Sequence, residues 1–465
     1  MSSKNDLAQE YKIVDARIYS ERLGDDVYNV TPYVLELSLF EDIELPYISG
    51  RLVCMDDIGA FDEMSLKGTE TVYLKVEGGG EENYDTNVGF DLEMKISSII
   101  RRDKITERIE GYTLNLISPI AFKDRGIKIS KSFQGKLTSM ITKIIQNYHG
   151  AKVNWDYLKS ESSQEPSKVI SPYLSPLEMC TWLLDRATTV SGVPYYLWQS
   201  IYEQSGYNNQ NLRLGSLDHM MTGGTVWNEK LPLIYAEARA QDAALLSTYD
   251  QAFIIKAFSE KDIEDTTRLM ESGSIGSQMT VLDTFTGQSY SKHFSVSELL
   301  KRGGKTLMRE EGGTTGIQNV FDEELTLEYQ GENKPSDQWN NVYFDTLTSY
   351  GNNGSSYGYH DDPRELDAMN KVRANAIRNL MDKNAITMVT SGAAFFRPMV
   401  STSSKIGVGA GDITKVEVIQ ADTSTEDIQI DYHRSGYYLI QKCRHTFQDG
   451  IHSVTSTVSK IHEYY

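Results

Sequence analysis

Two glycine-rich stretches contain residue types that bind phosphate in other proteins. The first, Gly407-Val408-Gly409-Ala410-Gly411-Asp412, lacks the Gly-Lys-Ser/Thr of a phosphate-binding loop and precedes a predicted strand. Such loops hold phosphate at the N-terminus of a following helix, so this stretch is interpreted as a tight turn. The second, Gly304-Lys305-Thr306, ends like a phosphate loop, but Leu299 stands where the first glycine is required. Neither stretch is predicted to bind a nucleotide.

One stretch matches the letters of a serine-hydrolase motif. Gly354-Ser355-Ser356-Tyr357-Gly358 reads Gly-x-Ser-x-Gly. A nucleophile elbow requires a strand directly before it and a helix directly after it. Here Asn352-Asn353 precede the motif and the next predicted helix begins only at Pro363, so the stretch is interpreted as a loop. The chain also has no His-Glu-x-x-His sequence, the pattern of a zinc hydrolase helix.

Histidines and acids offer two candidate metal positions. In His360-Asp361-Asp362-Pro363 no second histidine lies at ligand spacing, and Asp362 is interpreted as the cap of a helix that starts at Pro363. His445 and His452 flank the last turn and could face each other across a hairpin, where a structural pair is favoured over a metal site. We therefore predict no catalytic residue, no cofactor and no metal. With 65 acidic residues, a chance pair of carboxylates is expected somewhere in the fold.

The composition restricts the class of protein. The chain has 465 residues, a formal net charge of −19 and a pI near 4.9. Nucleic-acid affinity comes mostly from cationic side chains, so specific DNA or RNA binding is not expected. Three widely spaced cysteines predict no disulfide framework and a reducing compartment. No apolar run is long enough for a transmembrane helix, and the first residues lack the apolar stretch of a signal peptide.

The elements that position these residues follow a pattern that occurs twice. Residues 90–97 alternate apolar and polar side chains, a charged turn is predicted over 101–110, and residues 112–116 return. At the end of the chain, residues 437–445 run out, Gln448-Asp449-Gly450 turns and residues 453–459 run back. Alternation with a period of two predicts strands with one buried face, and Asp-Gly favours a hairpin turn. The sequence thus predicts the same β unit twice.

The chain divides into five predicted segments. The fold class is mainly β with α+β insertions: two tube-type antiparallel β-barrel domains plus two smaller inserted domains. The boundaries are 1–119 for the first barrel (completed by about 206–245), 120–205 for an inserted α/β domain, 246–290 for the start of the second barrel, 291–362 for an inserted or peripheral domain, and 363–465 for a helix and strands that complete the second barrel.

Two helices and one strand face have clear sequence signals. Ser175-Pro176-Leu177-Glu178 has the cap, the proline and the acid of a helix start, and the helix is expected to end near Ser191-Gly192 with Trp182 in the core. A second, longer helix begins at Pro363. On the last strand, Ser453, Thr455, Thr457 and Ser459 form a small, polar, uncharged face. That face is predicted either to line a wet channel or to be an ordinary solvated surface.

In their order along the chain, these elements resemble the central baseplate hub of contractile-tailed (myovirus-type) bacteriophages, whose fold also forms the spike base of type VI secretion. The segments that carry the resemblance are Ser49-Gly50-Arg51-Leu52, Asp56-Asp57-Ile58-Gly59, Gly68-Thr69-Glu70, Tyr112 to Leu116 running into Ile129 to Phe133, the Ser175-Pro176 helix with Tyr195-Tyr196-Leu197, the helix from Pro363, the Gly409 to Val416 turn and strand, and the last hairpin with His445 and Phe447. The resemblance covers nearly the whole chain.

The resemblance implies a structural virion protein and no enzyme. It implies a homotrimer whose six barrels form a pseudo-six-fold ring between the hexameric tail tube and the trimeric central spike. The implied partners are a second and a third copy of the chain, the tail tube protein, a central spike on a separate chain and baseplate wedge components. Genomic DNA would pass through the bore without specific binding, repelled where acidic residues line it, and no membrane insertion is implied. The implied location is the tail baseplate, assembled in the host bacterial cytoplasm.

Two other functions stay open at this point. One is a peptidoglycan-directed tail hydrolase, which needs a placed nucleophile or acid pair that the sequence does not provide. The other is a glycan-binding tail adhesin, suggested by 28 tyrosines and five tryptophans.

Overall fold

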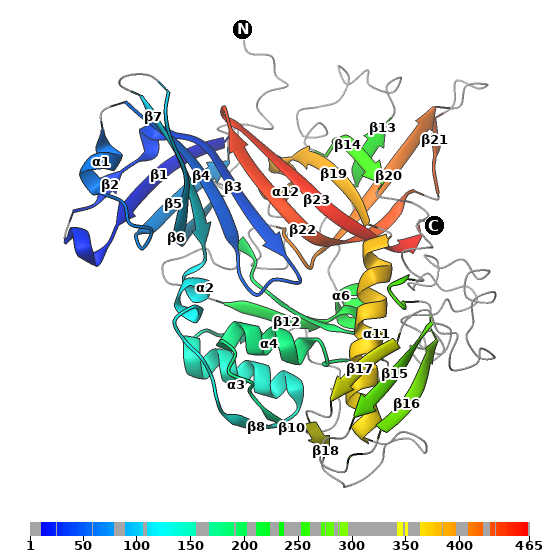
Figure 1. Cartoon of the computed structure of the whole chain (residues 1–465). Coiled ribbons are helices and arrows are strands. Elements are labelled where there is room, and N and C mark those ends of the chain that lie inside the picture. Colours follow the sequence, from blue (N-terminus) through cyan, green and yellow to red (C-terminus); the bar gives the residue numbers. More distant parts are fainter. Residues whose placement is uncertain are drawn as a thin grey trace.

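The protein is mainly β, as predicted, and most of its strands belong to one large sheet of 14 strands among the described residues (Figure 1). The computed structural model describes residues 11–24, 26–57, 59–78, 89–105, 109–154, 167–189, 192–201, 211–223, 232–236, 253–260, 271–274, 276–282, 287, 289–295, 342–346, 349–351, 363–383, 385–396, 408–421, 428–432 and 434–463. No helix within these ranges is both long enough and apolar enough to cross a membrane.

The N-terminal part of the large sheet is the first β unit, shown in blue in Figure 1. Its sheet order is β3-β4-β7-β6-β5-β1-β2. Alternate residues of these strands, such as Leu37, Leu52 and Leu114, are fully buried in a common core. The elements are β1 (Tyr11–Tyr19), η1 (Glu21–Leu23), β2 (Tyr28–Asn29), η2 (Thr31–Tyr33), β3 (Val34–Asp42), β4 (Ser49–Asp56), α1 (Ala60–Met64), β5 (Thr71–Gly78), β6 (Gly89–Lys104) and β7 (Glu110–Ile117).

The C-terminal part of the large sheet is the second β unit, whose sheet order is β14-β19-β23-β22-β20-β13. The amide of Ile234 donates to the carbonyl of Phe253 at 2.9 Å, which links β13 to the start of β14 and brings the two ends of this series together. The elements are β13 (Leu233–Ala236), β14 (Ile255–Glu260), β19 (Ala385–Ser391), α12 (Gly392–Phe396), β20 (Ile413–Ala421), β21 (Ile428–Ile430), β22 (Gly436–Gln448) and β23 (Ile451–Glu463).

The two units share one topology. In chain order, five strands of the first unit (β3, β4, β5, β6, β7) correspond to five of the second (β14, β19, β20, β22, β23). We refer to them as strands 1 to 5 of each unit. In both units the sheet order is 1-2-5-4-3, each neighbouring pair is antiparallel, and a short helix, α1 or α12, follows strand 2. The repeat predicted from the two hairpins is therefore present as a repeat of topology.

The correspondence extends to the irregularities of the strands. The register between strands 1 and 2 shifts once in each unit, and the register between strands 4 and 5 shifts one residue beyond equivalent isoleucines, Ile96 and Ile440. The amides of these two isoleucines donate to the residue just before strand 3, Glu70 at 3.0 Å and Asp412 at 2.9 Å. Bulges fix the local bend and twist of a strand, so the two units share these two bends. Each unit also has one further shift between strands 4 and 5 that the other lacks, between Ile99 and Arg101 in the first and between Tyr437 and Tyr438 in the second.

The two units are joined edge to edge by β22. Residues 436–439 of this strand pair with β20 of its own unit, and residues 442–448 pair antiparallel with β3 of the first unit. Lys442 Nζ lies 3.0 Å from Asp42 Oδ2 across the join. Beyond the join, Asp449 and Gly450 adopt positive φ as the predicted turn, and the Gly450 carbonyl accepts the amide of Tyr11 in β1. The hairpin tip therefore lies between β3 and β1 of the first unit.

An α/β domain follows the first unit in the chain and lies below it in Figure 1. Helices α3 and α4 contact each other and share a core with the sheet β11-β12-β9. The predicted capping box is present, because the Glu178 amide donates to Ser175 and the Ser175 amide donates to Glu178. The elements are α2 (Pro119–Asp124), β8 (Ser132–Gly135), α3 (Leu137–His149), β9 (Val153–Asn154), β10 (Ser167–Ile170), α4 (Pro176–Leu184), β11 (Tyr195–Trp198), β12 (Leu212–Ser216) and α6 (Leu217–Gly223).

A third small sheet, β16-β15-β17, contacts the long helix that was predicted to begin at Pro363. Buried residues of this helix, among them Val372 and Ile377, pack against Trp198 of the α/β domain and Leu439 of the second unit. The helix therefore contributes to a core shared by these parts. The elements are β15 (Gly276–Leu282), β16 (Ser289–Ser295), β17 (Val342–Thr346), β18 (Ser349–Gly351), which pairs with β10, and α11 (Pro363–Lys383).

Four sequence predictions require correction. The segment 246–290 does not belong wholly to the second barrel, since β15 pairs with β16 and β17 in a separate sheet. The strands described within 206–245 do not complete the first barrel, since β12 pairs with β11 and β9, and β13 pairs with β20. The charged turn predicted over 101–110 is shorter, because β6 remains paired with β7 as far as Lys104. Helix α4 ends at Leu184 rather than near residue 191, because the next amides, Arg186 and Ala187, bond three residues back and tighten the last turn.

Candidate functional site

The sequence stretches considered as candidate sites lie in different parts of the chain, and only some of them are described by the structure. Residues 304–306, 354–358 and 360–362 lie outside the described residues. The stretch ending in Asp412 is a turn before β20, as predicted, and the Asp412 carboxylate accepts the amide of Gly409 at 3.1 Å. The turn is thus closed by its own acidic side chain.

His445 and His452 form the pair that the hairpin predicted. Nδ1 of His445 lies 3.2 Å from Nε2 of His452, and both rings are fully or almost fully buried. Burial lowers the pKa of His445 to about 3 and that of His452 well below its usual value, so both imidazoles are neutral. His452 stacks on Phe447 at 4.1 Å. The described residues contain no group of three or more His, Cys, Asp or Glu side chains that could hold a metal.

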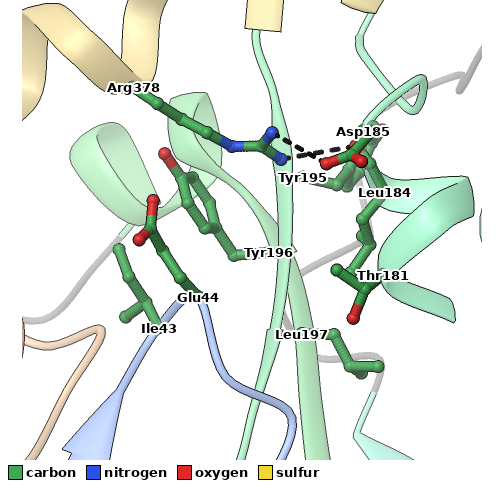
Figure 2. A pocket seen from close by; sticks show the side chains of 9 residues that line it. All are labelled: Ile43, Glu44, Thr181, Leu184, Asp185, Tyr195, Tyr196, Leu197 and Arg378. Atoms are coloured by element: carbon green, nitrogen blue, oxygen red, sulfur yellow. Dashed lines mark hydrogen bonds and ion pairs between the residues drawn. The ribbon is translucent and has the colours of Figure 1, made fainter. Parts of the chain in front are cut away.

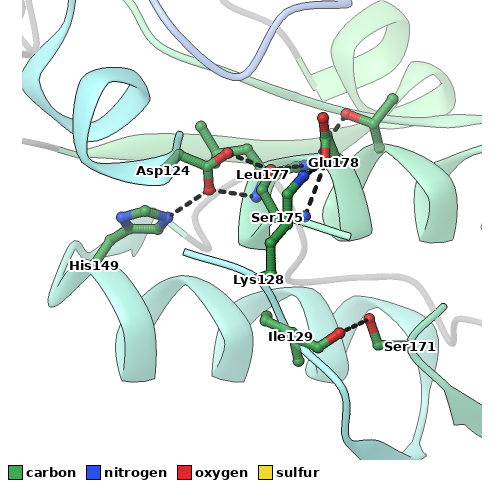
Figure 3. Close-up of polar contacts among 9 residues, drawn as sticks. Asp124, Lys128, Ile129, His149, Ser171, Ser175, Leu177 and Glu178 are labelled. Atoms are coloured by element: carbon green, nitrogen blue, oxygen red, sulfur yellow. Dashed lines mark hydrogen bonds and ion pairs between the residues drawn. The ribbon is translucent and has the colours of Figure 1, made fainter. Parts of the chain in front are cut away.

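One cluster contains the residue types of a hydrolase triad, although no sequence motif indicates it. Ser175 donates to Oδ2 of Asp124, and His149 Nε2 lies 3.0 Å from Oδ1 of Asp124 (Figure 3). In a triad the imidazole lies between the hydroxyl and the carboxylate, so that it can take the hydroxyl proton. Here the carboxylate lies between the other two. It also accepts the amide of Leu177 at 2.8 Å, so the cluster fixes the start of α4.

A pocket of about 230 Å³ opens where the α/β domain, α11 and the loop after β3 meet (Figure 2). Arg378 crosses it and donates to Asp185 at 3.3 Å and to the carbonyl of Leu184 at 3.4 Å. The same guanidinium lies over the ring of Tyr196, with 5.6 Å to the ring centre. These contacts tie α11 to the α/β domain, so the pocket marks a seam between parts of the chain.

The most constrained polar group at this seam is the carboxylate of Glu41 in β3, which is 1% exposed. Its two oxygens accept the amide of Ile201 at 2.6 Å and the amide of Ala410 at 2.8 Å. One side chain of the first unit thus accepts from the backbone just after β11 of the α/β domain and from the turn before β20 of the second unit. Desolvation by burial raises its pKa to about 7, although both amides and Arg213 oppose that shift.

Trp198 at the end of β11 makes the second polar link of this seam. Its Nε1–H donates to the carbonyl of Ala410 at 2.8 Å, and the indole is fully buried. Ala410 therefore donates its amide to Glu41 and accepts from Trp198. The turn before β20 is held by the first unit on one side and by the α/β domain on the other.

Replacing Trp198 with phenylalanine is expected to lower the free energy of unfolding by about 2 kcal/mol, because the Ala410 carbonyl loses its buried donor. Urea denaturation measures the change. Trp182 is the matched control, since it is partly buried and its ring stacks on Arg186 at 4.2 Å. Trp182→Phe is expected to cost less than about 1 kcal/mol. Equal losses in the two variants would contradict the role assigned to the Trp198 hydrogen bond.

The outer face of the joined sheet crosses from one unit to the other and carries polar side chains together with the partly buried Phe40 and Val53. On β23, Ser453, Thr455 and Thr457 are half-buried on this face, whereas Ser459 is buried and donates to the Met381 carbonyl at 2.9 Å. The polar, solvent-facing side of β23 is therefore shorter than predicted, because α11 covers it at Ser459.

The charges on this face nearly balance. Lys442 lies 3.0 Å from Asp42, and Arg444 lies 3.8 Å from Glu36, across the join between β22 and β3. Arg51 is exposed on β4, opposite Ser38 of β3. The acidic excess of the chain is therefore not concentrated on the described part of this face.

Comparisons with known proteins extend along almost the whole chain. No family model matches the sequence, and the search of curated proteins found no relative. The 43 kDa tail protein of prophage MuSo2 from Shewanella oneidensis is 12% identical with a TM-score of 0.48, covering 96% of this chain and 98% of that one. A tail protein from Neisseria meningitidis is 10% identical with a TM-score of 0.45, covering 97% of each chain.

A third similar structure is a component of the type VI secretion system of E. coli, described as structurally similar to tail proteins of bacteriophage T4. It is 8% identical with a TM-score of 0.38, covering 93% of this chain and 74% of that one. Two of these three structures are tail proteins and one is a component of type VI secretion.

Proposed function

We propose that the chain is a structural baseplate hub of a contractile tail. Three copies would form a ring of six β units that joins the hexameric tail tube to a trimeric central spike on a separate chain. DNA would pass through the bore, baseplate wedge components would bind outside it, and the protein would perform no catalysis. Assembly would take place in the host bacterial cytoplasm.

The observation that carries the proposal is the head-to-tail join of two equivalent units. Strand 4 of the second unit pairs with strand 1 of the first unit, so the two units meet through different edges. A contact between unlike surfaces repeats until it closes into a ring or extends as a filament. Because each chain contains two units, three copies of the chain supply six equivalent positions.

The outer face of the joined sheet supports the idea of a conduit. On this face β23 carries hydroxyl groups, and Lys442 and Arg444 at the join are paired with acidic residues, whereas Arg51 is exposed. Phosphate binding needs unpaired cations, so DNA facing this surface would slide without being held. The balance of charge, rather than an acidic lining, would keep the passage non-adhesive.

The hydrolase alternative has lost its best candidate cluster, since Asp124 lies between Ser175 and His149. No observation on the described residues favours the adhesin. If the protein is a hub, the isolated protein is expected neither to cleave peptidoglycan nor to be retained on a glycan column.

The experiment that tests the proposal is the mass of the purified protein in solution. We expect a species of three times the 52.5 kDa chain mass, measured by light scattering over a range of concentrations, with the central spike protein added in a parallel series. A ring closed through sheet edges buries exposed backbone groups and is favoured by mass action. A monomer that persists at high concentration, with and without spike protein, would overturn the hub.

A further inference from the structure

The repeat of the two units also assigns the surfaces through which one chain meets the next. We propose that β14 of one chain pairs antiparallel with the last residues of β6 in a neighbouring copy, and that this contact repeats the join between β3 and β22 within the chain. The inference rests on the proposed trimer, and adds to it the strands and the register of the subunit interface.

The join within the chain provides the template. Strand 1 of the first unit, β3, lies beside the last seven residues of strand 4 of the second unit, β22. Beyond these two strands, each unit continues with its own series of strands. In a ring, the next contact must place strand 1 of the second unit, β14, beside strand 4 of the following first unit, β6.

The two predicted edges overlap along the four residues Ala257–Glu260 of β14, which correspond to four of the seven residue pairs of the join. Strand β6 pairs with β5 only as far as Lys95, and from there to Lys104 its pairing within the described residues is with β7. In β22, the equivalent segment is the one that receives β3. Along Ala257–Glu260, β14 pairs with β19 among the described strands, as β3 pairs with β4 on the side away from the join.

The matching irregularities translate the register of the join into residue pairs. Counted along strand 5, His445 faces Val454, four residues before the partner of Ile440, and Arg102 faces Tyr112, four residues before the partner of Ile96. Over this interval β6 has one residue more than β22, because its register with β7 shifts a second time between Ile99 and Arg101. Arg102 is therefore the equivalent of His445.

On strand 1, Leu39 lies five residues beyond the start of β3, and Glu260 lies five residues beyond the start of β14, with the same bulge between. Leu39 is opposite His445 in the join. The template therefore places Arg102 of one chain opposite Glu260 of the next, and Asp103 opposite Ser259.

The chemistry of the two edges is complementary. An arginine and a glutamate opposite each other on neighbouring strands attract, whereas like charges there destabilise the pair. Arg102 is about half exposed and bonds Glu110 at 2.9 Å, and Glu260 bonds Arg434 at 2.8 Å, so the new pair would link two existing ion pairs. Ile100 and Ile105, both 58% exposed, lie along the same end of β6 and would be covered by the neighbouring chain.

Cysteine cross-linking tests the register directly. In the double variant Arg102→Cys/Glu260→Cys, oxidation of the trimer is expected to shift the chains on a non-reducing gel from one chain to covalent dimers and trimers. The variant Asp103→Cys/Ser259→Cys repeats the test at the adjacent pair, because hydrogen-bonded and non-bonded pairs alternate along an antiparallel ladder and differ in the spacing of their Cα atoms. The three native cysteines are all buried, so the unaltered chain is expected to form no cross-link and serves as the negative control.

The control variant is Lys75→Cys/Glu260→Cys, which moves one cysteine to β5, away from the predicted edge. It is expected to stay at the mobility of one chain. A wild-type trimer in which neither β6–β14 pair cross-links, or in which the control cross-links equally, would overturn the interface and leave the hub standing. A wild-type protein that forms no trimer, with or without spike protein, would overturn both.

Discussion

Replacing Glu41 with alanine is expected to lower the free energy of unfolding by about 4 kcal/mol at pH 5, among the largest effects of any single substitution at the seam. Two amides, Ile201 and Ala410, lose their buried acceptor together, and each unsatisfied buried donor costs about 1–3 kcal/mol. The space left by the side chain adds to that loss. Because these amides belong to different parts of the chain, the seam loosens on both sides.

Urea denaturation followed by circular dichroism measures the loss. The matched control is Glu36→Ala on the same strand, where the carboxylate lies on the outer face and contacts Arg444 at 3.8 Å. An ion pair of this exposed kind contributes about 0–1 kcal/mol. If the two variants lose the same stability, Glu41 does not hold the seam.

The pH dependence of the same variant has a definite sign. Burial raises the pKa of Glu41 from 4.5 to about 7, so the folded protein binds this proton more tightly than the unfolded chain does. Stability from this group is therefore present below pH 4.5 and is lost as the pH rises through 7. The difference in free energy of unfolding between wild type and Glu41→Ala should decrease by up to about 3 kcal/mol between pH 5 and pH 8. A difference that widens over this range would contradict the raised pKa.

Substituting alanine for Gly392 is expected to cost roughly 3 kcal/mol, because an added methyl group would overlap the imidazole of His452. That ring cannot move aside cheaply, since it stacks on Phe447 and contacts His445. Gly392 begins α12, the short helix that follows strand 2 of the second unit. The substitution should therefore push α12 away from the hairpin that joins the two units.

Thermal unfolding of Gly392→Ala and Gly126→Ala compares a glycine packed against a side chain with a glycine that has space for a methyl group. A methyl group at Gly126 would meet its nearest neighbour, the Lys123 carbonyl, at an ordinary 3.7 Å. Gly126→Ala is expected to be neutral or stabilising by less than about 1 kcal/mol. Equal midpoints for the two variants would show that His452 yields to the methyl group.

Local chemistry made much of the fold predictable. Alternating residues identified the strands around Leu92 and Val454, and an Asp-Gly pair located the turn at residue 449. Ser175 and Glu178 identified the start of α4, because a capping box is made by residues three apart. These features depend on neighbours in sequence, and so a sequence pattern is enough to recognise them.

The parts that were mispredicted or missed depend on distant residues. The strand at 212–216 could join any sheet, and its pairing with β11 follows from a core formed with α3 and α4. The seam could not be predicted, because Glu41 meets Ala410 across 369 positions of sequence. The bulges that align the two units have no composition signal of their own, and only their equal placement in two sheets reveals them.

Because β22 belongs to both units, a push applied to one half of the chain is carried to the other along a continuous strand. The seven residue pairs of the join follow one another along β22. A force directed along the strand therefore loads all seven pairs in shear, and they are expected to separate together rather than one after another. The two halves of the chain are therefore expected to resist a force along β22 as one unit.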